Sequence, residues 1–156
     1  MTIAHECNDL RDEAEERAAV AREARRWEGT PFHWRAQIPG PQGGADCATF
    51  PCAVYQNVGL FTIPVHDMPE QWHLHRGREE YVETIAPFMR ECTIGEIREG
   101  DFLMTRIGRL YSHGGIVVGW PLLVHCYGFG VHCVNVLTDA VWRGQENRYF
   151  SPWGKR

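Results

Sequence analysis

The sequence predicts an α+β domain in which N-terminal helices pack on a mainly antiparallel sheet of five or six strands. Two observations support this prediction. Apolar residues recur at helical spacing in the first part of the chain, whereas from Gly100 they alternate with polar residues, as in strands. Helices followed by strands are typical of the α+β class. The 156 residues fit a single domain over 1–156, with residues 1–8 expected to be a flexible end.

Three segments have the pattern of helices. Residues 9–27 place an alanine-rich stripe on one side and carry arginines near their end, which suits the helix dipole. Residues 47–58 follow Asp46, a residue type that often caps helices. Residues 77–91 form the third predicted helix, although Pro87 disfavours a regular last turn.

The segments between these helices are predicted loops. Residues 29–45 are rich in glycine and proline, and they carry three large rings in succession, Phe32, His33 and Trp34. Residues 61–76 form the second loop, which holds His66, His73 and His75. The remaining five elements are strands, at about residues 101–106, 113–118, 122–127, 131–136 and 147–150.

Charge and hydropathy exclude several classes of partner. The 16 basic and 20 acidic residues give a net charge of −4, so no global basic field attracts nucleic acid or anionic lipid. No apolar run is long enough to cross a bilayer, and the acidic N-terminus lacks the apolar core of a signal peptide. We therefore expect synthesis in the cytoplasm without membrane insertion, and reduced cysteines.

The residue inventory limits the chemistry further. The only lysine is Lys155, which excludes a phosphate-loop lysine and a Schiff base within the domain. The only serines, Ser112 and Ser151, do not lie in a G-x-S-x-G elbow. Six cysteines and eight histidines remain, so sulfur and imidazole are the expected carriers of any catalysis.

Cys47 is the predicted nucleophile among the cysteines. It is the only one at the start of a predicted helix, where the helix dipole and a nearby imidazolium lower a thiol pKa. The other five cysteines are interpreted as small core residues or as surface residues without a catalytic role.

His113 is the predicted base, and His125 lies on the next strand. A three-residue loop at 119–121 would pair His113 with Tyr127 and place His125 diagonally on the same face. A two-residue loop would instead put the two histidines on opposite faces.

These positions carry a resemblance to a known family. The stretches Gly29-Thr30-Pro31-Phe32, Asp46-Cys47, Ser112-His113-Gly114-Gly115-Ile116-Val117 and Val124-His125 resemble the NlpC-type cell-wall peptidases, a branch of the papain-like superfamily. The resemblance is strongest to phage-encoded members and extends over about residues 18–150.

The resemblance implies a cysteine peptidase with Cys47 as nucleophile, His113 as base and acid, and His125 as the orienting third member. The implied substrates are peptidoglycan stem peptides, cut between D-γ-glutamyl and a diamino acid, without a metal or other cofactor. Phe32, Asp46 and Ser112 would line the substrate groove. Family members often have Tyr where Phe32 stands, so oxyanion binding would fall to backbone N–H groups or to His33.

Three alternatives stay open at this point. If Gly128 and Phe129 form a two-residue turn, His125 faces His132, and His113 would complete a zinc site. A catalytically silent module of a phage tail or assembly is the second alternative, with phage tail proteins as partners. The third is an amidase or acyltransferase acting on another amide or ester. For the cell-wall peptidase itself, the expected delivery route is a virion or another machine, such as a secretion machine.

Overall fold

The structure is a computed structural model that describes residues 3–68 and 78–154, with side chains described from residue 12 onward. The described α-helices are α1 (Ile3–Arg26), α2 (Thr49–Asn57) and α3 (Glu80–Ile85). Short 3₁₀ helices occupy Val65–Asp67, Ala86–Phe88 and Ile94–Glu96. No helix in this described part combines the length and the apolar character that a membrane span requires.

The described strands form two sheets. The strands are β1 (Gln37–Ile38), β2 (Gly44–Ala45), β3 (Arg90–Cys92), β4 (Phe102–Ile107), β5 (Leu110–Gly119), β6 (Leu122–Tyr127), β7 (Gly130–Asn135) and β8 (Asn147–Ser151). The main sheet has six strands in the order β3-β8-β4-β5-β6-β7, and every neighbouring pair is antiparallel. β1 and β2 form a separate small ribbon. The predicted α+β class with an antiparallel sheet is therefore confirmed.

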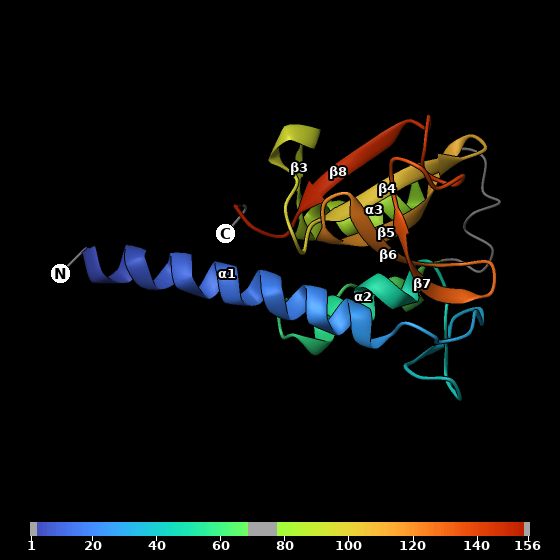
Figure 1. Cartoon of the computed structure of the whole chain (residues 1–156), viewed down its shortest axis with the longest axis horizontal. Helices are drawn as coiled ribbons and strands as arrows, with labels where there is room; N and C mark the ends of the chain where they lie inside the picture. Colours follow the sequence, from blue (N-terminus) through green and yellow to red (C-terminus); the bar gives the residue numbers. More distant parts are fainter. Residues whose placement is uncertain (1–2, 69–77, 155–156) are drawn as a thin grey trace.

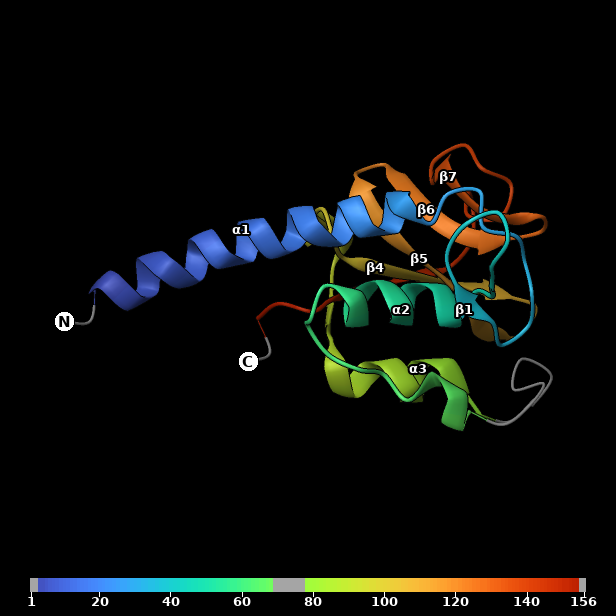
Figure 2. The same cartoon turned by 90° about the horizontal axis from the view of Figure 1, so that it is seen from below.

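The three α-helices lie together in front of the main sheet when the molecule is seen from below (Figure 2). Because side chains alternate along strands, Phe102 and Met104 of β4 join the main core with the helices, which contribute Trp27 and Phe50. The intervening Leu103 belongs to a second cluster instead. That cluster also contains Val117, Leu123, Val136 and Trp142, the last two from the segment between β7 and β8.

Helix α1 is anchored by its C-terminal half. Val20, Ala24 and Trp27 are buried in the main core, and the buried Arg17 pairs with the Asp101 carboxylate at 3.0 Å. The N-terminal half extends away from the rest of the molecule (Figure 1). The helix begins at Ile3, well before the predicted start at residue 9, so helix covers most of the 1–8 end that we expected to be flexible.

The predicted helix over 77–91 is wrong in its second half. After α3 the chain forms a 3₁₀ turn and then β3, which pairs with β8. The physical reason is Pro87, which has no N–H to donate into a continuing α-helix. The predicted start of this helix at residue 77 lies outside the described residues.

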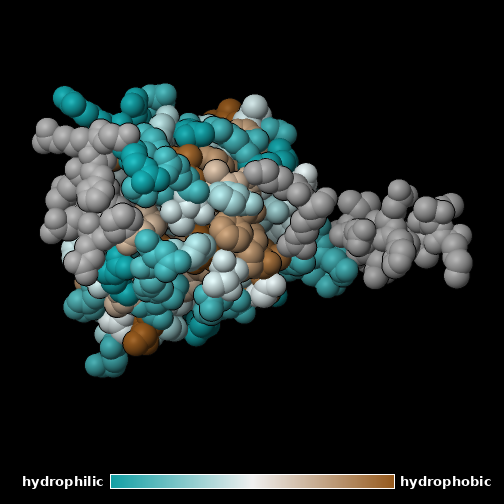
Figure 3. Space-filling model, turned by 180° about the vertical axis from the view of Figure 1, so that it is seen from behind, coloured by the Kyte–Doolittle hydropathy of each residue, from teal (hydrophilic) through white to brown (hydrophobic). Residues whose placement is uncertain are grey.

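Figure 3 shows the face opposite that of Figure 1, on which hydrophilic residues surround a small apolar area near the centre.

Candidate active site

Asp46 organises the start of α2. Its Oδ1 accepts hydrogen bonds from the N–H groups of Ala48 and Thr49, both at 2.8 Å. Its own N–H donates to the Thr49 hydroxyl, also at 2.8 Å. Asp46 thus supplies hydrogen bonds to the backbone that leads into α2, but the helix begins at Thr49 with Ala48 as its N-cap, so the predicted helix start at Cys47 is wrong by two residues. Pro51 fits because it lies in the first turn, where its missing N–H is not needed.

These hydrogen bonds fix Cys47 two residues before the first residue of α2, against β5 and α3. The Cys47 side chain is buried, and its thiol donates to the Ser112 carbonyl at 3.6 Å. The Cys47 carbonyl accepts a hydrogen bond from the Tyr81 hydroxyl at 2.8 Å. The sulfur is therefore in contact with the residue that directly precedes His113.

His113 and His125 are brought together as predicted. Nε2 of His113 lies 2.8 Å from Nδ1 of His125, and His125 is directly opposite Gly115, which makes it a diagonal neighbour of His113. Nδ1 of His113 is buried and has no hydrogen-bond partner among the described residues. One nitrogen of His113 is thus held in place, while the other keeps its hydrogen-bonding capacity unused.

The register arises differently from the prediction. Gly119 pairs with Leu122 and Val117 pairs with Leu123, so the turn between β5 and β6 has two residues and Val118 is an extra residue in β5. A bulge of this kind shifts the alternation of a strand by one residue. It therefore offsets the two-residue turn and leaves the two histidines on the same face.

Burial sets the protonation of these groups. Burial, followed by the nearby His132, lowers the pKa of His113 to about 3. Burial also lowers the pKa of His125 to about 2, with smaller contributions from His113 and His132. Both rings are therefore neutral near pH 7.

Burial raises the pKa of Cys47 well above its ordinary value, and the negative charge of Asp46 adds to this effect. The expected lowering of the Cys47 pKa is therefore wrong for the free protein. The helix start does not compensate for the loss of solvent around the sulfur, and His113 is neutral. The resting pair consists of a thiol and an imidazole.

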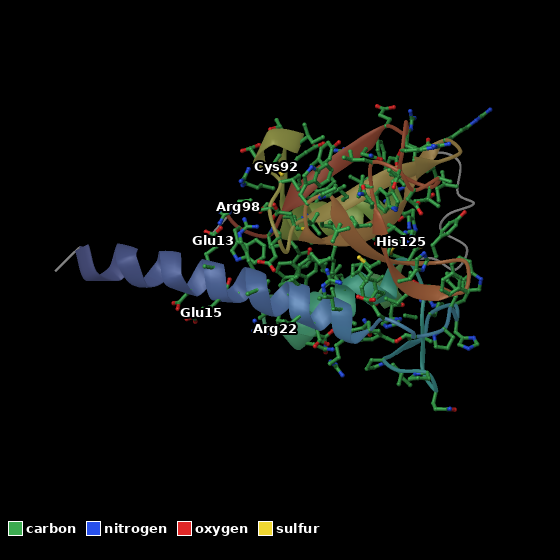
Figure 4. All side chains as sticks on the ribbon, in the orientation of Figure 1. Glu13, Glu15, Arg22, Cys92, Arg98 and His125 are labelled. Carbon is green, nitrogen blue, oxygen red and sulfur yellow. The ribbon has the colours of Figure 1, made fainter. Side chains whose placement is uncertain are left out.

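Among the cysteines whose side chains are described, Cys47 is the one that contacts Ser112, the residue before His113. Cys52 and Cys126 are buried, and burial raises the pKa of Cys126 to about 12. Cys92 lies on β3, away from His125, as Figure 4 shows. Cys133 is partly buried on β7. Cys7 lies where side chains are not described.

The residues that we expected to line the substrate groove are close to Cys47 in different ways. Phe32 bridges to Ala45 and packs partly on the core, while His33 is exposed and its N–H donates to the Ala45 carbonyl at 2.9 Å. Ser112 is buried beside the Cys47 thiol. Asp46 is buried, and its second carboxylate oxygen accepts the Arg35 N–H at 2.7 Å, so its oxygens already serve the local backbone.

Two aromatic residues at the site were not predicted. The Tyr81 hydroxyl holds the Cys47 carbonyl, and the Trp142 indole N–H donates to Nδ1 of His125 at 3.1 Å. Tyr81 lies within the predicted helix over 77–91, whose pattern does not indicate a contact with Cys47. Trp142 lies in an irregular segment, where no periodic pattern indicates which residue it contacts.

The zinc alternative finds no support in the arrangement of the histidines. His125 does face His132 across the two-residue turn at Gly128 and Phe129, as predicted. However, His125 contacts His113 through Nδ1 and His132 through Nε2, so the three rings do not converge on one point. Within the described part of the chain, no group of three potential ligands is placed to hold a metal ion. His73 and His75 lie outside the described residues.

Comparisons with known proteins identify the fold. No protein-family model matches the chain. No curated protein sequence matches it either. Among solved structures, the NlpC/p60 domain of the peptidoglycan hydrolase SagA is 21% identical, with a TM-score of 0.57 over 85% of this chain and 96% of that one.

Two mycobacterial structures are similar to the chain as well. The peptidoglycan hydrolase RipB of Mycobacterium tuberculosis is 15% identical, with a TM-score of 0.62 over 89% of this chain and 65% of that one. The P60 domain of an antigen from M. avium paratuberculosis is 13% identical, with a TM-score of 0.60 over 92% and 94% of the two chains. The molecule thus has the fold of the NlpC/p60 domains.

Proposed function

We propose that this protein is a cysteine peptidase that cleaves amide bonds in peptidoglycan stem peptides. The observation that carries the proposal is the neighbourhood of the sulfur. The Cys47 thiol contacts the carbonyl of Ser112, and the next residue, His113, has a buried Nδ1 without a described partner. The fold shared with two structures named as peptidoglycan hydrolases indicates the class of substrate.

The proposed chemistry begins from a neutral pair. The Cys47 side chain turns from the Ser112 carbonyl toward Nδ1 of His113, which removes the thiol proton as the sulfur attacks the substrate carbonyl. Because the resting thiol is not ionised, proton transfer and attack occur together. His113 then donates this proton to the leaving amine, and afterwards activates the water that hydrolyses the thioester.

The oxyanion is assigned to backbone donors. The Cys47 N–H lies at its own sulfur, where it slightly opposes the rise in the thiol pKa. One N–H at this place contributes about 3 kcal/mol to stabilisation of the transition state. Phe32 has no hydroxyl to add, and the exposed His33 on the neighbouring loop is the side chain proposed to assist.

The finer assignments are part of the same proposal. The scissile bond is the one between D-γ-glutamyl and a diamino acid, Phe32, His33 and Ser112 contact the substrate, and Asp46 supports the groove through α2. Phage association, with tail proteins as partners, and delivery to the cell wall by a virion or another machine stay predictions of the sequence.

Digestion of purified peptidoglycan tests the proposal. Wild-type protein is incubated with purified cell walls and with a synthetic L-alanyl-γ-D-glutamyl-diaminopimelate peptide, and the products are identified by mass spectrometry. We expect cleavage after the γ-linked glutamate, and no cleavage by Cys47→Ala. Cys92→Ala is the matched control because it removes a thiol on β3 and is expected to retain activity. Folded wild-type protein that cleaves neither substrate would contradict the proposal.

A further inference from the structure

His132 extends the pair of histidines at the candidate site. It lies on β7, directly opposite His125, and its Nε2 is 3.1 Å from Nε2 of His125. Its Nδ1 is 2.9 Å from the carbonyl oxygen of Gly130. Three rings therefore form one hydrogen-bonded row from His113 to the backbone of β7.

The Gly130 end of this row places one proton on His132. A carbonyl oxygen only accepts, so Nδ1 of His132 must carry a proton and donate it. Nε2 of His132 is the acceptor in its contact with His125, because the neutral His125 already accepts the Trp142 indole N–H at Nδ1 and so carries its own proton on Nε2. The proton between His125 and His132 therefore belongs to Nε2 of His125, which leaves Nδ1 of His125 unprotonated.

The Trp142 end sets the direction of these hydrogen bonds. An indole N–H only donates, and that of Trp142 lies 3.1 Å from Nδ1 of His125. Nδ1 of His125 must therefore be an acceptor. His113 places its Nε2 only 2.8 Å from the same unprotonated atom, so Nε2 of His113 must be the protonated nitrogen, and the two donors share the single lone pair of Nδ1.

We propose that His132 and Trp142 are positioning residues, which hold His113 in the tautomer with a proton on Nε2 and a free lone pair on Nδ1. This inference rests on the function proposed for Cys47 and His113, because that lone pair is the one that accepts the thiol proton. Neither residue needs to contact substrate. They prevent the other tautomer of the buried, neutral His113, in which Nδ1 would carry a proton. An N–H facing the sulfur could not act as a base.

His132 and Trp142 each favour the same tautomer of His113, so the loss of one should be compensated by the other. This compensation distinguishes the proposal experimentally. His132→Leu removes the acceptor at one end, and Trp142→Phe removes the donor at the other while keeping an aromatic ring. Each single variant should keep the His113 tautomer and lower kcat about twofold to threefold. The double variant should show mixed tautomers and a further loss of about tenfold beyond the product of the single effects, with KM unchanged.

Nitrogen-15 NMR of histidine-labelled protein at pH 7.5, together with single-turnover kinetics on the synthetic stem peptide, makes the test. In wild-type protein we expect protons on Nε2 of His113 and His125 and on Nδ1 of His132. His132→Gln in the Trp142→Phe background restores an acceptor and should return both the tautomer and kcat to those of Trp142→Phe. Cys133→Ala, on the opposite face of the same strand, is the matched control.

Two results would overturn the inference. The first is a proton on Nδ1 of His113 in the wild type. The second is a double variant that keeps the wild-type tautomer of His113 and whose loss of kcat equals the product of the two single effects. If the double variant does not fold, the wild-type spectrum still decides. Wild-type protein with the expected tautomers but without cleavage of stem peptides would refute the proposed function while supporting the positioning row.

Discussion

At the residue scale, Asp46 acts on Cys47 in two opposite ways. Its carboxylate accepts hydrogen bonds from the backbone that leads into α2 and so fixes the position of the thiol. Its negative charge also raises the pKa of that thiol, after the larger effect of burial. A residue that the resemblance assigns to the substrate groove thus fixes the position of the nucleophile and adds to the effect of burial on the pKa of its thiol.

Asp46→Asn separates these two effects. The variant retains one oxygen for the two N–H groups that lead into α2 but loses the hydrogen bond from the Arg35 N–H. It also removes the charge, so the thiolate of Cys47 becomes more favourable and its pKa falls. The rate of Cys47 alkylation by iodoacetamide, followed by mass spectrometry from pH 6 to pH 10, should rise at lower pH than in the wild type. Asp101→Asn is the control, since that buried carboxylate is not among the groups that raise the Cys47 pKa. Superimposable profiles for wild type and Asp46→Asn would refute this account.

At the scale of elements, β5 is the strand on which the site depends. It carries the Ser112 carbonyl and His113, and its bulge at Val118 sets the register with β6. Gly114 allows the main core to approach the strand closely. A Cβ at this position would overlap the Phe102 ring and lie 2.8 Å from the Tyr81 hydroxyl that holds Cys47.

Gly114→Ala should therefore destabilise the domain by about 1–3 kcal/mol, the usual cost of overpacking a core. Because Tyr81 must move, the variant should also lose activity on stem peptides at temperatures where it remains folded. Urea unfolding measures the first effect. Gly95→Ala is the matched control, since the nearest atom to its added Cβ is 3.9 Å away. Equal unfolding midpoints for the two variants would show that the core accommodates the methyl group.

Much of this level of structure was readable in the sequence. Alternating apolar residues gave the strands that became β4 to β8, and the pattern around His125 gave its pairing with His132. The bulge was not readable, because an extra residue in a strand leaves no periodic signature. β3 was not predicted, because its three residues, Arg90–Cys92, are too few to show the alternation of a strand.

The site was predictable in its membership but not in its electrostatics. Cys47, His113 and His125 stand out by residue type and by their places at the ends of elements. The pKa directions depend on how completely the fold excludes water from them, and neighbouring residues in the sequence do not report that. The contact between Trp142 and His125 joins positions 17 residues apart through an irregular segment, so it could emerge only from the fold.

At the scale of the whole molecule, the sheet separates two cores, and histidines are buried without charge beside the smaller one. Trp142 of that second cluster contacts both His113 and His125 through its ring. Burying these rings is favourable only while they are neutral. Protonation of His113 and His125 in the unfolded chain therefore lowers the stability of the folded domain.

The free energy of unfolding should consequently fall as the pH decreases below the ordinary pKa of a histidine side chain. The pKa values of His113 and His125, about 3 and about 2, lie below the unfolded value near 6.5, so the unfolded chain binds more protons below that pH. From pH 7 to pH 5 the free energy of unfolding should decrease by about 4 kcal/mol for the pair, before carboxylates contribute much.

Urea unfolding at half-unit steps of pH measures this decrease. His125→Asn should show a clearly smaller dependence on pH than the wild type, and His33→Gln, at an exposed position, is the matched control. A free energy of unfolding that stays level between pH 7 and pH 5 is incompatible with neutral burial of the two rings.

The loop that follows α1 has a consequence for solubility. Gly29 and Thr30 exchange backbone hydrogen bonds with Val131, and the Phe32 N–H donates to the Phe129 carbonyl, so this loop lies along the outer border of β7. A bare border of a sheet is a template for pairing with other chains. Here the protein's own backbone occupies that template, and at the opposite border β3 is only three residues long and carries charged side chains. The fold thereby protects itself against strand-to-strand aggregation at both borders of its main sheet.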